Sequence, residues 1–171
     1  MNRQRFLKSG AALIGAVLLP ACGFKLRGTQ TFAFDNIAVE ASPAGAVTIQ
    51  LRKALGSQLF VNTAASRAGT PPLAQVTLDI LQELTERAVA GVNAAGQVRE
   101  LQLRIRVKFR LRNARGKDLI EETEILQQRD ISFSESAVLA KEVEEALLYK
   151  NMQADVVQQL LRRLAAVKSI V

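Results

Sequence analysis

The chain has 171 residues, with 23 Lys and Arg against 16 Asp and Glu and a formal net charge of +7. This length is enough for one domain with its own hydrophobic core. The sequence contains no His and a single Cys, which excludes imidazole-based catalysis, His-ligated metal sites and internal disulfides. The positive charge suits an anionic partner but does not demand nucleic acid.

The first 21 residues have the features of an export signal. A basic start precedes the apolar run Ala11–Leu19, which is as long as a signal-peptide core and far too short to span a bilayer as a helix. The run ends in Leu19-Pro20-Ala21-Cys22, which resembles the lipobox of bacterial lipoproteins. We therefore expect a lipoprotein signal peptide at 1–21, lipid attachment at Cys22 and a lipidated tether at 22–31.

Two further observations bear on this signal. Gly23 is not Asp, so the resemblance to lipoproteins points to the outer membrane and not to inner-membrane retention. The alternative is a soluble export signal with a chance cysteine. A lone unpaired Cys in an exported protein would be a liability, which favours lipidation, because several acyl chains anchor a protein where one is marginal.

The most regular pattern in the sequence is the segment Arg99–Arg112, where apolar and polar residues alternate strictly. A period of two puts every apolar side chain on one face of a β-strand, and a slip of one residue would bury the cations. Turn signals lie on both sides, at 91–96 and 113–116. Strands at 76–90, 98–112 and 117–131 are therefore expected to form an antiparallel meander, with Val76, Leu78, Ile80 and Leu84 on one face of the first.

The basic face of the central strand has two interpretations. In the first, acids on the following strand balance it, with Arg110 near Asp118, Arg106 near Glu122 and Arg104 near Glu124 after a short loop that ends in a Gly bulge. In the second, it is an anion-binding surface.

The flanking segments add a strand and two helices. Phe32–Ala41 is expected to be a first strand, Ala46–Phe60 an amphipathic helix and Val61–Pro72 a loop. Ser134 or Ser136 is expected to cap a final helix that runs to about Val167, with an interruption at Lys150 and Asn151 and an apolar stripe of Val143, Leu147, Ala154, Val157, Leu161 and Leu164.

The expected fold is therefore α+β, with a four-stranded, mostly antiparallel sheet packed by two α-helices. The element order is strand-helix-strand-strand-strand-helix, in a single domain over residues 32–171.

This order, together with the Cys22-Gly23-Phe24-Lys25-Leu26-Arg27 start, resembles the LPS-assembly lipoprotein family LptE. The Gly96-Gln97 turn, the 138–141 opening of the last helix and the 160–164 helix end are also similar to the family. The resemblance implies a lipid-anchored outer-membrane protein on the periplasmic side, which plugs the LptD β-barrel and helps to move lipopolysaccharide into the outer leaflet. It implies neither a catalysed reaction nor a cofactor.

The resemblance also implies basic residues that bind lipopolysaccharide. One family position, at the start of the last helix, matches Lys141. The other lies in the turn before Gly96-Gln97, where this chain departs from the pattern with Ala94. Arg99 or Arg87 lies nearby and is a candidate to supply that charge. The alternative for Lys141 is an ordinary helix residue paired with Glu144 or Glu145.

Three other functional classes compete with this one. A free outer-membrane lipoprotein that binds another anionic envelope ligand is the main alternative. For an enzyme, the candidate acids Glu121, Glu122 and Glu124 are expected to face cations, which would lower their pKa values, and no nucleophile elbow or phosphate loop is present. Nucleic-acid binding is not expected, since no aromatic residues interleave with the basic face.

Overall fold

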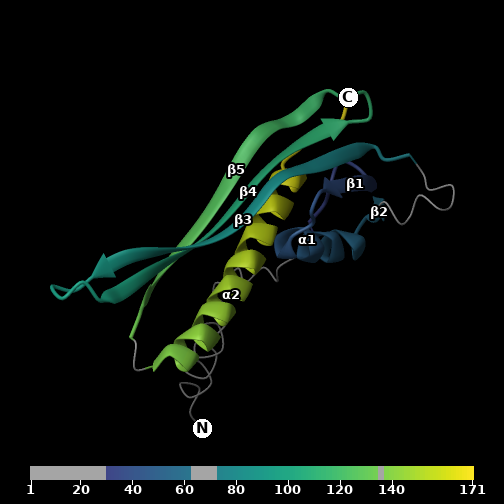
Figure 1. Cartoon of the computed structure of the whole chain (residues 1–171). Helices are drawn as coiled ribbons and strands as arrows, with labels where there is room; N and C mark the ends of the chain where they lie inside the picture. Colours follow the sequence, from purple (N-terminus) through teal and green to yellow (C-terminus); the bar gives the residue numbers. More distant parts are fainter. Residues whose placement is uncertain (1–29, 63–72, 135–136) are drawn as a thin grey trace, which may run out of the picture.

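In a computed structural model, residues 30–62, 73–134 and 137–171 are described, and they form two helices and five strands. The sheet has the strand order β2-β1-β3-β4-β5. The helix α2 runs across one face of this sheet, and α1 packs beside α2 (Figure 1). The elements are β1 (Asn36–Ala41), α1 (Ala46–Gly56), β2 (Phe60–Asn62), β3 (Val76–Val92), β4 (Val98–Asn113), β5 (Asp118–Ser132) and α2 (Val138–Ala165).

The α+β class and the meander β3-β4-β5 are confirmed, but the prediction of four strands is wrong. The short strand β2 is a fifth member of the sheet, and β1 pairs in parallel with both β2 and β3. The predicted first helix ends four residues early, at Gly56. A turn that closes on Leu55 follows, and it lets Phe60 donate its backbone N–H to Asp35 O at 3.0 Å. The sheet is therefore mixed.

The central strand β4 has the predicted alternation. Its apolar side chains form the middle of the hydrophobic core, and none of them is more than 4% exposed. Burial of an aliphatic or aromatic side chain contributes about 1.5–3 kcal/mol, so this row is a large part of the stability of the domain. The buried residues of the row are Leu101, Leu103, Ile105, Val107, Phe109 and Leu111.

A register shift in β3 changes which of its side chains face the helices. Pairing with β4 is regular up to Ile80, shifts at Leu81 and resumes with Gln82 opposite Lys108. Because one extra residue inverts the parity of a strand, Leu84 lies opposite Arg106 on the outer face and is 38% exposed. The prediction that Leu84 shares a face with Val76 is therefore wrong.

The helix α2 is continuous over 28 residues, without a break at Lys150 and Asn151. Its C-terminal half is buried as predicted, but Val143 and Leu147, at 72% and 57% exposure, and Ala154 are exposed. Heptad spacing cannot show where the sheet stops covering a helix. The residue before α2 is Ala137 and no side chain caps the helix, so Ser134 does not have the predicted role, while Ser136 lies outside the described residues.

Within the described part of the chain, no helix combines the length and hydropathy needed to cross a membrane.

Acids balance most of the basic outer face, as the first interpretation predicted, but the observed pairs differ from the predicted ones. Glu124 binds Arg106 at 3.0 Å and Glu122 lies 4.0 Å from Lys108, while Asp118 is opposite Arg112 in the ladder. The hairpin closes between Asn113 and Lys117, which sets Asp118 opposite Arg112, and two register shifts between Phe109 and Arg112 then set Glu124 opposite Lys108. Glu124 therefore stays on the predicted outer face, whereas Ile120, between the two shifts, lies opposite the buried Leu111.

Asp79 of β3 holds two guanidinium groups on this outer face. Its Oδ2 accepts hydrogen bonds from Arg112 Nε at 2.7 Å and Arg110 Nε at 2.8 Å, and its Oδ1 accepts one from Arg112 Nη2 at 3.0 Å. Burial raises the pKa of Asp79, but the hydrogen bonds from Arg112 and Arg110 outweigh this effect and leave the pKa below its ordinary value of 3.8. The cluster ties β3 to β4 by side chains.

Glu83 fastens α1 to the sheet. The register shift at Leu81 turns Glu83 to the helix face, where its carboxylate accepts hydrogen bonds from the backbone N–H groups of Val47 at 2.8 Å and Thr48 at 3.1 Å and from the Thr48 hydroxyl at 2.7 Å. The helix has no cap of its own, because Gly45 precedes it. A Cβ atom on Gly45 would overlap the Glu83 carboxylate.

We predict that Glu83→Ala lowers the free energy of unfolding by about 1–2 kcal/mol, because the first turn of α1 loses its N-terminal cap. Glu86→Ala is the matched control, since Glu86 lies on the outer face of the same strand. Chemical denaturation followed by circular dichroism measures both. Equal effects of the two substitutions would contradict the capping role.

Asp79→Asn is predicted to lower stability at neutral pH by about 1–2 kcal/mol, as charge-assisted hydrogen bonds to partly solvated guanidiniums are lost. Because the pKa of Asp79 is lower in the folded state, this stabilisation is complete above its ordinary value of 3.8. It is lost as the pH falls through the folded-state pKa. The difference between the variant and the wild type should therefore vanish in acid, and a penalty independent of pH would refute the assignment. Asp118→Asn, at the exposed end of β5, is the control.

Candidate functional site

The two long hairpins end in turns of the same construction at opposite ends of β4. In the first, the Asn93 side chain accepts backbone hydrogen bonds from Ala95 at 3.0 Å and Gln97 at 2.9 Å. In the second, Asn113 accepts equivalent bonds, both of 3.0 Å, from Arg115 and Lys117. Gly96 and Gly116 both have positive φ angles, 78° and 84°, which a residue with a Cβ atom adopts only with strain. The two turns differ in the residues that surround them.

Arg87 extends from β3 towards α2 near the first of these turns. The shift at Leu81 places it on the helix face, opposite Leu103. Its Nε lies 3.6 Å from a carboxylate oxygen of Glu145 on α2, and its guanidinium carbon is 5.8 Å from the centre of the Phe133 ring. A cation over an aromatic face is attracted by the ring quadrupole. Arg87 thus bridges the sheet, α2 and the segment between β5 and α2.

Arg99 and Lys141 lie around the same Phe133 segment. The Phe133 N–H donates to Arg99 O at 2.8 Å, and the side chain of Arg99 is exposed and contacts Gln97 Oε1 at 3.2 Å. Lys141 donates from Nζ to Ser132 Oγ at 3.0 Å and to Glu144 at 2.8 Å. The predicted alternative, a pair with Glu144, is therefore present, and the additional bond to Ser132 ties the first turns of α2 to the end of β5.

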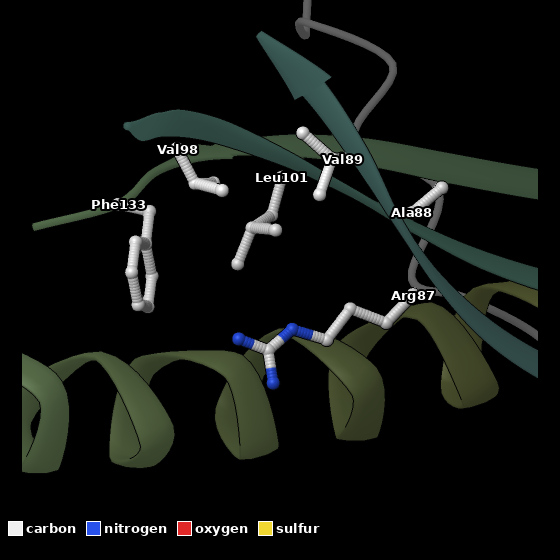
Figure 2. A pocket seen from close by; sticks show the side chains of 6 residues that line it. All are labelled: Arg87, Ala88, Val89, Val98, Leu101 and Phe133. Carbon is white, nitrogen blue, oxygen red and sulfur yellow. The ribbon is translucent and has the colours of Figure 1, made fainter. Parts of the chain in front are cut away.

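A cleft of about 250 Å³ lies beside Arg87. Figure 2 shows Arg87 reaching below the side chains of Leu101, Val98 and Phe133, with its terminal nitrogens directed towards the Phe133 ring and α2 beneath. Phe133 lies beyond the last predicted strand, and in the sequence only its position between two elements could have indicated a role. The residues that line the cleft are Arg87, Ala88, Val89, Val98, Leu101 and Phe133.

The three predicted basic residues therefore gather at one end of the molecule, where β3, β4, β5 and α2 meet. Ala94, the departure from the family pattern, is exposed in the turn at this end. Cys22, the predicted site of lipid attachment, lies outside the described residues. No group of three or more His, Cys, Asp or Glu residues in the described segments is arranged to hold a metal ion.

The outer face of β4 is a poorer candidate for anion binding. Most of its cations already have acidic partners within the sheet: Asp79 holds Arg110 and Arg112, and Glu124 holds Arg106. An incoming anion would have to compete with these pairs. The end of the molecule with Arg87 and Arg99 offers guanidiniums in looser contacts.

Comparison with known proteins shows the family of this chain. The sequence profile of the lipopolysaccharide-assembly family LptE matches residues 34–164, a range that covers all the described elements except the last residue of α2. The chain belongs to the LptE family. No curated protein matches it in sequence.

Solved structures of bacterial lipoproteins share the LptE fold of this chain. Uncharacterized lipoprotein B from Nitrosomonas europaea is 30% identical with a TM-score of 0.68, and the match covers 84% of this chain and 91% of that one. Rare lipoprotein B from Shewanella oneidensis is 22% identical, with a TM-score of 0.60 and coverages of 77% and 92%. A minor lipoprotein from Acinetobacter baumannii is 17% identical, with a TM-score of 0.59 and coverages of 80% and 94%. The last two likenesses concern the fold alone.

Tyr149 reports on this end of the LptE domain, because it is the single tyrosine of the chain. Its hydroxyl donates to Glu86 O at 2.8 Å. Burial and the carboxylate of Glu145 raise its pKa above the ordinary value of 10.0, and Arg87 opposes this shift.

We predict that Arg87→Gln raises the pKa of Tyr149 further and that Glu145→Gln lowers it, since the first removes a cation and the second an anion near the phenol. Titration of tyrosinate absorbance measures the pKa without interference from other tyrosines. Arg99→Gln should leave the pKa unchanged, because the charged groups that shift the pKa of Tyr149 are Glu145 and Arg87. If Arg87→Gln left the pKa of Tyr149 unchanged, the result would show that Arg87 does not form the bridge to α2.

Proposed function

We propose that this LptE family member is an outer-membrane lipoprotein, acylated at Cys22, that plugs an LptD-like β-barrel and helps to assemble lipopolysaccharide into the outer leaflet. The protein catalyses no reaction and needs no cofactor. It binds lipopolysaccharide directly at the end of the molecule formed by the β3–β4 hairpin and the start of α2. Family membership supports the role in lipopolysaccharide assembly, and the Leu19-Pro20-Ala21-Cys22 motif supports the anchor.

The observation that carries the proposal of direct binding is the convergence of Arg87, Arg99 and Lys141 around Phe133. Arg87 and Arg99 come from the two strands of the β3–β4 hairpin, and Lys141 comes from α2, which follows later in the chain. Phosphates and carboxylates of the glycolipid would accept charge-assisted hydrogen bonds from them, and guanidinium groups bind such anions bidentately. Arg99 and Arg87 replace the charge that Ala94 does not supply.

The apolar surface of α2 supports the plug. Leu139, Val143 and Leu147 are spaced by four residues, so they lie on one stripe of the helix, and their exposed fractions are 79%, 72% and 57%. A contiguous apolar stripe in contact with water is typical of an interaction surface. In the proposed complex the lumen of the barrel covers it.

Copurification from outer membranes tests the plug. A tagged full-length chain should elute in detergent as a one-to-one complex with a large outer-membrane β-barrel protein. The same chain with Leu139, Val143 and Leu147 changed to Ser should yield less of the complex, while substitution of the exposed Leu84 on the sheet should not. Recovery of the protein as a monomer would instead favour a free lipoprotein that binds another anionic envelope ligand.

The double variant Lys141→Gln, Arg99→Gln should bind lipopolysaccharide at least about tenfold more weakly, because each lost charge-assisted hydrogen bond contributes about 1.5–3 kcal/mol. The matched control is Arg115→Gln, Lys117→Gln, which removes the same charge from the opposite turn. Binding of the purified proteins to immobilised lipopolysaccharide gives the affinities. Equal losses in the two double variants would indicate a non-specific charge effect and contradict the proposed site.

A further inference from the structure

The cleft beside Arg87 combines an apolar lining with one cationic side chain. Five of the six residues that line it are apolar, and the sixth is Arg87. Leu101 is 4% exposed and belongs to the hydrophobic core, while Phe133 and Val98 pack against that core and are half-buried. The floor of the cleft is therefore continuous with the interior of the domain. Transfer of an apolar group from water to such a surface is favourable by about 25 cal/mol per Å².

The apolar surface continues from the cleft along the β3–β4 hairpin. Val89 is opposite Leu101 in the ladder, and Val92 is opposite Val98. Val89 and Val92 remain 58% and 59% exposed. These cross-strand pairs form a strip towards the end of the hairpin, longer than the cleft itself. A linear alkyl chain matches this shape better than a compact ligand does.

The guanidinium of Arg87 lies at the edge of this strip and can accept an anion. Among the described residues, Glu145 is its only ion-pair partner, through Nε at 3.6 Å, and the Arg87 side chain is 48% exposed. Its terminal nitrogens point into the cleft in Figure 2. A guanidinium has five N–H donors, so one loose contact leaves donors for a phosphate.

The volume decides how much of a ligand enters. Sites for whole small molecules occupy about 300–1,000 Å³, whereas this cleft has about 250 Å³. It therefore accepts part of an amphiphile and leaves the rest outside. A free phosphate would leave the apolar walls unused, and an uncharged alkane would leave Arg87 unused.

We propose that this cleft is an acyl-chain subsite, in which one fatty-acyl chain of lipopolysaccharide lies against Val98, Leu101 and Phe133 while an adjoining phosphate binds Arg87. The inference deepens the proposed function and rests on it, because that function supplies the glycolipid. It differs from the charge contacts of Lys141 and Arg99 in requiring contact between the chain and the apolar floor.

The absence of tryptophan from the sequence makes the contact measurable. Phe133→Trp places a single fluorophore in the cleft, and Leu126→Trp places a control fluorophore on the outer face, where Leu126 is 45% exposed. Bromine atoms on an acyl chain quench tryptophan only in near contact. The probe is phosphatidic acid with one dibrominated acyl chain, mixed into detergent micelles with the full-length protein, and thermal unfolding verifies that both variants fold.

The expected result is quenching at position 133 that exceeds quenching at position 126 at least twofold and is reversed by unbrominated lipopolysaccharide. Adding Arg87→Gln to the reporter should raise the lipid concentration for half-quenching severalfold. With dibrominated phosphatidylcholine, whose phosphate is balanced by choline, half-quenching should need more lipid and depend less on Arg87. Equal quenching of the two reporters, or quenching that lipopolysaccharide does not reverse, would overturn the subsite.

A parallel measurement separates this inference from the proposed function. The Phe133→Trp protein is tested for binding to immobilised lipopolysaccharide. Binding without selective quenching removes the acyl-chain subsite and leaves the charge contacts of the proposed function intact. If the wild-type protein does not bind lipopolysaccharide either, both the acyl-chain subsite and the direct binding of the proposed function are ruled out.

Discussion

A single register shift in β3, at Leu81, determines how the two faces of the sheet are used. Without it, Glu83 and Arg87 would project outward with the polar residues of the meander. With it, Glu83 reaches the N-terminus of α1 and Arg87 reaches Glu145 and Phe133. The inverted parity also moves Leu84 to the outer face. The attachment of α1 and the cation beside the cleft therefore depend on the same extra residue.

Part of this fold could be predicted because its patterns are local. The alternation along β4 determines which face is buried, and the turns Asn93–Gly96 and Asn113–Gly116 at its ends determine the meander. The shift at Leu81 left no signal, because a bulge adds one residue to a strand whose composition is unchanged. The strand β2 was missed because three residues are too few for a periodicity and its pairing partner Ile37 is distant in sequence. The apolar residues of α2 kept a helical spacing beyond the point where the sheet covers them.

For the candidate site, the basic residues could be named from the sequence, but Phe133 and the cleft could not. Lys141 was named from the resemblance to the LptE family, and Arg99 was named because it lies near Ala94, where the family's charge is missing. The structure places Lys141 in contact with Ser132 and Arg99 in contact with Phe133. Phe133 itself carried no signal, since a lone aromatic residue between a strand and a helix is most often part of the core. The cleft depends on cross-strand neighbours, such as Val89 opposite Leu101, that become known only with the register. The presence of acids opposite the basic outer face was predicted, but the register shifts between Phe109 and Arg112 changed which residues pair.

In the proposed function, the glycolipid binds at the β3–β4 turn and not at the β4–β5 turn. The two turns share their hydrogen-bond geometry, and each exposes an alanine one residue after its asparagine: Ala94 in the first turn and Ala114 in the second. The most direct test is a photo-cross-linking amino acid at each position in living cells, with adducts detected by an antibody to lipopolysaccharide. The account predicts an adduct at position 94 and little or none at position 114. Equal labelling of the two turns, or labelling at position 114 alone, would contradict it.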